Sequence, residues 1–267
     1  MTEAWYLACG PKDVADRAVL VGDPGRVKLF AAQLDDPRIV GDNRGLQVVT
    51  GTTNGIPVTA CAFGMGAAVA VIVLEELAQL GVRTVLRAGT AMTLAADGLG
   101  DLVVASAGVR EEAASATYLP ASFPATSDLD LLFDLLVALE QRDERYRVGL
   151  VASLDGFYTE MFAARPEREQ EVSARLEGLS AAGVVAVDME TSALLTVASR
   201  LGVRAASLCL ASVDAKSRAR LEGDERDEGE RRLVEVALAA LRRPEEGFKR
   251  ALRAAARTDV TTADREV

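Results

Sequence analysis

The chain has 267 residues, of which 49% are hydrophobic and only 4% aromatic, and its formal net charge at pH 7 is −10. This much apolar material is sufficient for a large core in one or two domains. A chain of this charge repels nucleic acids and anionic membrane surfaces as a whole, so we expect neither as a partner, and local arginines must hold any bound phosphate.

The sequence contains no histidine. This excludes Ser-His-Asp and Cys-His nucleophile systems, the H-E-x-x-H zinc site and a histidine pH switch. Cys9, Cys61 and Cys209 are far apart and lack C-x-x-C spacing, so we predict neither a metal site nor a disulfide framework. The N-terminus lacks the pattern of a signal peptide, and the apolar run Ala67–Leu74 is too short to span a bilayer. We therefore expect a cytoplasmic, reducing setting.

Short apolar runs alternate with longer helical patterns along the chain. The apolar runs predict strands at Ala18–Gly22, Leu46–Thr50, Pro57–Phe63, Thr84–Ala88, Asp101–Val109, Arg147–Ser153, Val184–Val187 and Arg204–Ala211. Helical periodicity predicts helices at Ala67–Leu80, Asp128–Arg142, Glu167–Ser180, Thr191–Leu201 and Glu225–Arg242. Most of these strands are apolar throughout, which is typical of sheets covered on both faces. The order predicts an α/β fold with a mixed, largely parallel sheet.

The C-terminal part of the chain is charged. We predict that Gly223–Arg232, which reads GDERDEGERR, is the solvated entrance of a helix. Thr258–Val267 has almost nothing to bury, and we predict a frayed tail there.

The segment VLVGDPGRV, Val19–Val27, ends a strand at Gly22 and turns into a helix that we expect to begin near Arg26. Glycine lets a ligand approach the backbone, a helix N-terminus offers N–H donors to an anion, and an arginine adds a bidentate contact. The alternative is an ordinary D-P-G turn.

The segment TVLRAGTAM, Thr84–Met92, places Arg87 at the end of an apolar strand, directly before Gly89 and Thr90. A buried unpaired charge is costly, so this arginine needs an anionic partner. One reading is an oxyanion bound at the carboxyl end of the strand, and the other is a buried arginine–carboxylate pair.

The segment VVAVDMETSALL, Val184–Leu195, places Asp188, Met189 and Glu190 between a strand and a helix. Glu190 can accept hydrogen bonds from vicinal sugar hydroxyls while Met189 packs on the ring, or the carboxylates act as helix N-caps. Gly64 and Gly66 follow another strand, with no third glycine for a dinucleotide site. They suit either a close-lying ligand or a tight packing turn.

Five stretches occur together in one order: VGDPGR, EELAQLGVRTVLRAGT, GDLVVASAGVR, SLDGFY and VDMET. From about Trp5 to about Asp214, the chain resembles the nucleoside phosphorylase-I family, and most closely its uridine phosphorylase branch. The resemblance implies a single three-layer α/β/α domain over residues 1–257. It implies reversible phosphorolysis of a nucleoside to free base and pentose 1-phosphate, without metal or organic cofactor. It also implies dimers, usually assembled into a hexamer, with each active site shared by two subunits.

The resemblance assigns roles to residues at matching positions. Phosphate is held by Gly22, Arg26, Arg87 and Thr90, with Arg44 reaching in from the neighbouring subunit. Met189 and Glu190 bind the sugar, and Tyr6 stands where the family has a histidine that reaches the 5′-hydroxyl. Phe157, Met92 and Asp188 are expected at the base. Arg87, Glu190 and Asp214 are the candidate catalytic residues.

The chain departs from the family pattern at several positions. The glutamine and arginine that read uracil have no match in Thr159-Glu160-Met161-Phe162, so the base site is altered. Val213 stands where the purine branch has its acid, and Asp214 is one residue later, so its role as an acid stays open. Gly45 and Val69 replace the residues that bind a monovalent cation, and we expect no such cation.

We therefore expect a uridine phosphorylase-like enzyme with an altered base site. The alternatives are a phosphorylase of purine or non-standard nucleosides, a hydrolase of the same fold, and a weakly catalytic or non-catalytic nucleoside-binding homologue.

Overall fold

The computed structural model describes residues 2–243 and 247–254. Its first half contains β1 (Arg17–Val21), α1 (Pro24–Ala31), β2 (Asp35–Asn43), β3 (Leu46–Thr53), β4 (Ile56–Ala62), α2 (Ala67–Leu80), β5 (Thr84–Thr93) and β6 (Leu102–Glu111). Its second half contains β7 (Ala125–Thr126), α3 (Leu129–Glu140), β8 (Tyr146–Leu154), α4 (Glu169–Ala181), β9 (Val184–Asp188), α5 (Thr191–Leu201), β10 (Arg204–Asp214) and α6 (Gly223–Leu241). A π-helical turn, Phe157–Met161, follows β8.

All of these strands belong to one sheet, in which β10, β6, β8, β9 and β5 are consecutive neighbours. Because β5 also pairs with β10, these five strands close into a ring. The other edge of β5 pairs with β1, beyond which lie β4, β3 and β2. Parallel pairings join β1 with β4 and β5, β5 with β10, and β8 with β6 and β9, whereas the remaining pairings are antiparallel. The predicted mixed sheet is confirmed, but it is not largely parallel, because among the described strands five pairings are parallel and five are antiparallel.

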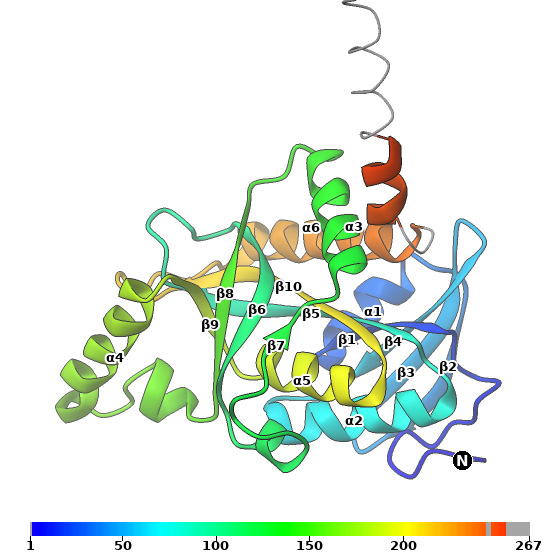
Figure 1. The fold of residues 1–267 in the computed structure, drawn as a ribbon, viewed down its shortest axis with the longest axis horizontal. Coiled ribbons are helices and arrows are strands. Elements are labelled where there is room, and N and C mark those ends of the chain that lie inside the picture. Colours follow the sequence, from blue (N-terminus) through cyan, green and yellow to red (C-terminus); the bar gives the residue numbers. More distant parts are fainter. Residues whose placement is uncertain (1, 244–246, 255–267) are drawn as a thin grey trace, which may run out of the picture.

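The helices cover the sheet in two outer layers (Figure 1). Helices α1, α3 and α6 lie on one face, where α3 packs against α6, and α2 and α5 pack together on the other. Each layer has its own apolar core. Helix α4 stands apart at the β8 and β9 end and closes a smaller core that includes Met92 and Met161. The three-layer α/β/α arrangement is the one implied by the resemblance.

The predicted elements are mostly found, and two helices, α2 and α5, have the predicted bounds. Helix α1 begins at Pro24 rather than near Arg26, because the Asp23 side chain accepts a hydrogen bond from the backbone N–H of Gly25 and caps the helix. Strand β2 was not predicted: its sequence, DDPRIVGDN, is polar and mostly exposed, as suits an edge strand. Strand β5 runs on to Thr93, so Arg87 lies within the strand.

Two further expectations concern the C-terminal tail and the domain bounds. The tail expected at 258–267 lies outside the described residues, and the single domain over 1–257 stays a prediction. In the described ranges, no helix combines the length and apolar character that crossing a membrane requires.

Candidate functional site

The four glycine- and charge-bearing segments converge at one place. A Cβ on Gly22, after β1, would lie 2.9 Å from the backbone oxygen of Gly64, so these two turns are in close contact. The N–H of Gly66 donates to Glu190 Oε1 at 2.7 Å. Glu190 in turn contacts the guanidinium of Arg87 on β5. These links join residues that are widely separated along the chain, so tertiary packing alone creates the site.

Arg87 is buried and surrounded by anionic and soft acceptors. Its Nη2 lies 2.5 Å from Glu190 Oε2 and 3.0 Å from Asp188 Oδ2, and its Nη1 donates to Cys209 Sγ at 2.7 Å. Burial alone lowers the pKa of Arg87, but Cys209, Asp188 and Glu190 outweigh it and raise the pKa. Burial is the largest cause of the raised pKa of Cys209, and the charge of Arg87 opposes it. Arg87 is thus a permanent buried cation held by two carboxylates.

Gly89 provides the space that this guanidinium occupies. Residues two apart on a strand share one face. A Cβ built on Gly89 would lie 2.1 Å from Arg87 Nη1, a distance that no side chain tolerates. The R-A-G sequence is therefore a steric requirement for laying the arginine flat along β5.

Asp188 and Glu190 have different roles at the start of α5. Asp188 is 2% exposed and accepts hydrogen bonds from the Ser153 hydroxyl at 2.6 Å and from the Thr191 hydroxyl and N–H at 2.5 and 3.1 Å. Glu190 occupies the N-cap position of α5 but its side chain makes no capping hydrogen bond, and the first N–H groups of the helix are bound by the Asp188 side chain instead. Glu190 is therefore available to Arg87, Gly66 and a ligand. Contact between Asp188 and a base stays a prediction.

Arg26, on α1, is also buried and paired. Its Nη2 lies 3.1 Å from Glu230 Oε1 on α6, and its Nη1 donates to the backbone oxygen of Ala88 at 3.4 Å. Because Ala88 follows Arg87 on β5, Arg26 contacts the backbone of β5 next to Arg87. The Nε atoms of both are buried, and within residues 2–243 and 247–254 they find no hydrogen-bond partner. The structure thus brings together the two arginines expected to bind phosphate, each with a carboxylate partner.

Apolar and aromatic side chains gather beside these arginines. Met92 is 2% exposed, and Met189 and Phe162 pack against the same cluster. The ring of Phe157 is stacked on that of Phe162, with centroids 6.1 Å apart and planes 5° apart. Thr90 is half-buried on β5, two residues before Met92. The expected base-end residues Phe157 and Met92 therefore lie in one region.

Two arginines that the sequence did not single out reach this aromatic region. Residues 212–221 fold back on themselves, with Val213 bridged to Arg220. The guanidinium carbons of Arg218 and Arg220 each lie 5.0 Å from the centre of the Phe162 ring. Arg218 also donates to the backbone oxygen of Met161 at 2.9 Å. These cations stand beside the stretch that lacks the family's base-reading residues.

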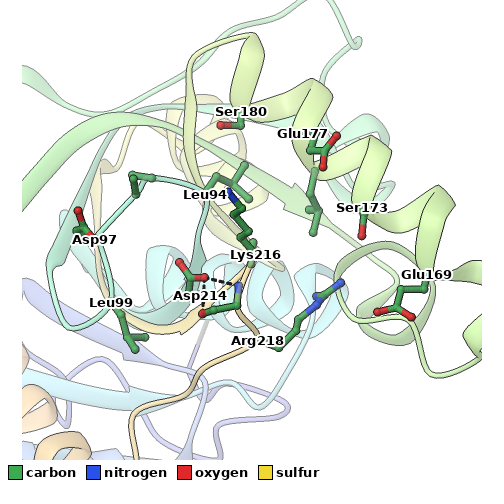
Figure 2. Close-up of a pocket in the computed structure, with 15 residues that line it drawn as sticks. Leu94, Asp97, Leu99, Glu169, Ser173, Glu177, Ser180, Asp214, Lys216 and Arg218 are labelled. Carbon is green, nitrogen blue, oxygen red and sulfur yellow. Dashed lines mark hydrogen bonds between the residues drawn. The ribbon is translucent and has the colours of Figure 1, made fainter.

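Asp214 is the last residue of β10. A register shift between Ala211 and Val213 lets Val213 pack against the cluster of Met92. Asp214 instead accepts hydrogen bonds from the N–H and hydroxyl of Ser217, both at 2.7 Å, beside a cavity of about 1220 Å³ (Figure 2). Burial raises its pKa, but the hydrogen bonds from Ser217 and the Lys216 charge prevail and lower it. Figure 2 shows α4 as the opposite wall of this cavity.

Tyr6 and Arg44 form a separate pair at the end of the β2–β3 hairpin. Arg44 is exposed, and its guanidinium carbon lies 5.7 Å from the centre of the Tyr6 ring. The N–H of Tyr6 donates to Glu76 on α2 at 2.8 Å, and Asn43 Nδ2 donates to its backbone oxygen at 2.9 Å. In the described part of the chain, this pair makes no hydrogen bond or ion pair with Arg26 or Arg87.

Residues able to hold a metal are not grouped in the described ranges: no three or more Cys, Asp or Glu side chains are arranged for that purpose. The expectation of no cofactor stays a prediction.

Comparisons with known proteins agree with this geometry. A family model described as the phosphorylase superfamily matches residues 16–243. The chain is 35% identical to a guanosine phosphorylase of Halorubrum lacusprofundi over 210 residues, covering 78% of this chain and 83% of the relative. It is 32% identical to the uridine phosphorylase of Escherichia coli over 250 residues, covering 91% and 98%. A crystal structure of uridine phosphorylase from Vibrio fischeri matches with a TM-score of 0.77 and 28% identity, covering 90% of this chain and 97% of that one.

A single mixed sheet between helical layers, with Glu190 paired to the buried Arg87 of β5, agrees with the matches to phosphorylases and indicates a phosphorylase-type α/β enzyme. The chain belongs to the phosphorylase superfamily. The resemblance seen in the sequence is confirmed. The relatives include both a guanosine and several uridine phosphorylases, so they do not establish which base the substrate carries.

The sequence did not reveal Glu230, Cys209, Arg218 or Arg220 as neighbours of the site. Glu230 was included in a stretch expected to be solvated, and this expectation is wrong for Gly229 and Glu230, which are buried. A signal was present: Glu230 precedes Leu233, Val234 and Ala237 at helical spacing, so it shares their buried face. For the other three residues, no local pattern indicated a partner.

Proposed function

We propose that this protein cleaves the N-glycosidic bond of a nucleoside with inorganic phosphate and releases the free base and a pentose 1-phosphate. The observation that carries the proposal is that Arg26 contacts the backbone of β5 at Ala88, the residue after Arg87, while Arg87 itself contacts Glu190. Two buried cations suit a phosphate dianion, and an adjoining carboxylate suits sugar hydroxyls. Membership of the superfamily and the names of the relatives support the same pentosyltransferase reaction.

In the proposed reaction, Gly22, Arg26, Arg87 and Thr90 hold phosphate below the sugar. A phosphate oxygen forms a bond to C1′ while the bond from C1′ to the base nitrogen breaks, and its electron pair leaves with the base. The arginines fix the position of the nucleophile and balance its charge within a buried site. The reverse reaction uses the same groups.

Glu190 is proposed to bind the 2′- and 3′-hydroxyls, with Met189 against the sugar ring. The Gly66 N–H and Arg87 hold its two carboxylate oxygens at 2.7 and 2.5 Å, which fixes the carboxylate while leaving further lone pairs for hydroxyl donors. Sugar and phosphate are therefore bound by groups that contact each other directly.

For the base end, we propose recognition by Phe157 and Phe162 together with Arg218 and Arg220. Guanidinium groups are hydrogen-bond donors only, so they favour a base that presents carbonyl oxygens. Uracil and guanine both do so, whereas adenine does not. This preference is compatible with the names of the uridine and guanosine phosphorylase relatives.

We further propose that the working unit is a homodimer, with Arg44 and Tyr6 completing the partner's site. Tyr6 is held to α2 through Glu76, and Trp5, Met65 and Ile72, on α2 or on the segments before it and joined to it, have exposed side chains. Whether dimers join into a hexamer, and whether the protein resides in the cytoplasm, are further expectations of the same resemblance.

The test is incubation of the purified protein with uridine, guanosine, inosine, adenosine and their deoxy forms, with and without phosphate. We expect base release that requires phosphate and favours bases with carbonyl groups. Arg87→Ala should abolish release, whereas Arg231→Gln, on the exposed side of α6, should not. Release without phosphate would indicate a hydrolase, and binding of nucleoside without release would indicate a non-catalytic homologue.

A further inference from the structure

Glu230 is a buried carboxylate that the proposed reaction does not use. It lies on α6, and its side chain is 12% exposed. Its Oε1 is shared between two arginines: Arg26 Nη2 at 3.1 Å and Arg226 Nε at 3.3 Å, one helical turn earlier. The two arginines differ in environment, because the side chain of Arg26 is 3% exposed and that of Arg226 is 51% exposed.

The pairing with Glu230 reduces the net charge that Arg26 offers to an incoming anion. A second anion on the same guanidinium is repelled by the carboxylate, and in a buried site this repulsion is weakly screened. Arg87 is also paired with carboxylates, but Glu190 is itself proposed to bind the sugar and Asp188 also accepts hydrogen bonds at the start of α5. Glu230 has no such second use within the site.

Arg226 provides the alternative partner for this carboxylate. Arg226 contacts the same oxygen and is more exposed to solvent than Arg26. Glu230 therefore keeps one ion pair when the N–H groups of Arg26 bind another anion. Among the described residues, the buried Nε of Arg26 has no hydrogen-bond partner. This guanidinium can therefore donate a further hydrogen bond to an anion.

We propose that Glu230 sets the affinity of the site for phosphate by competing for Arg26, and that Arg226 relieves this competition. The inference rests on the proposed function for the role of Arg26. The consequence is that the site binds phosphate less tightly than it would without Glu230. The affinity for the nucleoside is unchanged. A merely structural carboxylate would instead strengthen phosphate binding by orienting Arg26.

The test measures binding of inorganic phosphate by calorimetry and, separately, the KM for phosphate and for nucleoside. Glu230→Gln removes the charge but keeps an oxygen at the position of Oε1, so both arginine contacts are retained. We expect phosphate to bind roughly tenfold tighter, with a matching fall in its KM and an unchanged nucleoside KM. The matched control is Glu228→Gln, on the same helix but paired with the exposed Arg231, which should change phosphate affinity by less than about twofold.

A second variant should change the affinity for phosphate in the opposite direction. Arg226→Gln removes the alternative partner and should weaken phosphate binding about threefold or more, whereas Arg231→Gln, which removes an equally exposed arginine, should not. Because Arg226 is exposed, this variant tests the idea even if Glu230→Gln fails to fold.

Unchanged or weaker phosphate binding in folded Glu230→Gln would overturn the inference. Equal changes of phosphate affinity in Arg226→Gln and Arg231→Gln would also overturn it. Calorimetry separates this result from the proposed function. If the wild-type protein binds phosphate and cleaves no nucleoside, the proposed function fails, and the ratio of phosphate affinities still decides the role of Glu230. If neither wild type nor Glu230→Gln binds phosphate, the inference is wrong.

Discussion

Gly89 and Arg87 illustrate how one residue determines the geometry of another. The guanidinium lies over the Cα of Gly89, where a Cβ would be 2.1 Å from Nη1. Arg87 is also the link between phosphate and sugar in the proposed mechanism, because it holds Glu190. Any displacement therefore affects both substrates.

We predict that Gly89→Ala displaces the arginine and lowers kcat/KM on the order of 100-fold, since small misplacements of positioning groups are costly. The measurement is steady-state kinetics alongside thermal unfolding. Gly178→Ala on α4 is the control: its Cβ would meet nothing within 4 Å, so stability should rise by about 0.5–1 kcal/mol with activity unchanged. Wild-type kinetics in Gly89→Ala would contradict the geometry.

The lowered pKa of Asp214 does not suit a proton donor. Its pKa is lowered, so the carboxyl is ionised at neutral pH, and the stability that it contributes is lost only as pH falls through this lowered value. A general acid needs its protonated form near the working pH.

We therefore predict that Asp214→Asn changes kcat by less than about threefold between about pH 5.5 and pH 8 and leaves the shape of the pH profile intact. The profile should be recorded with a purine and a pyrimidine nucleoside. Loss of one limb of the purine profile in the variant would restore Asp214 as the acid suggested by the sequence.

At the scale of elements, α2 carries an unusual surface. One side packs against α5 in the core, whereas Val69 and Ile72, three residues apart on the other side, are 36% and 38% exposed. Met65, just before the helix, and Trp5, on the segment that Glu76 fixes to it, are 83% and 82% exposed. Apolar side chains gathered on a helix and its neighbours are typical of an interface.

We predict that Ile72→Glu dissociates the proposed homodimer, because it places a charge on this apolar surface. Phosphorolysis should fall with it, since Arg44 and Tyr6 would no longer reach a partner. Analytical ultracentrifugation and activity over a range of protein concentrations provide the measurements. Leu129→Glu, at a leucine on α3 that is 67% exposed compared with 38% for Ile72, is the control that should alter neither. A wild-type monomer with full activity would refute the shared site.

At the scale of the whole molecule, the closed ring of strands determines where the site lies. Strand β5 pairs with β1, β9 and β10, so it joins the ring to the rest of the sheet. This position lets α1, α5 and α6 all direct side chains to the middle of β5. The sequence predicted the strands and a mixed sheet, but the pairing of β5 with β10 depends on residues more than a hundred positions apart.

The sequence by itself determined the α/β class, the bounds of α2 and α5, the superfamily and the four segments of the site. These properties are written in local patterns: apolar periodicity, glycine turns and short motifs. Only the tertiary structure decided that Asp188 caps α5 while Glu190 holds Arg87, and that Arg26 is paired with Glu230. The physical reason is that a buried charge takes its partner from whichever element packs against it, and that choice is made by the assembled sheet and helices rather than by neighbouring residues in the chain.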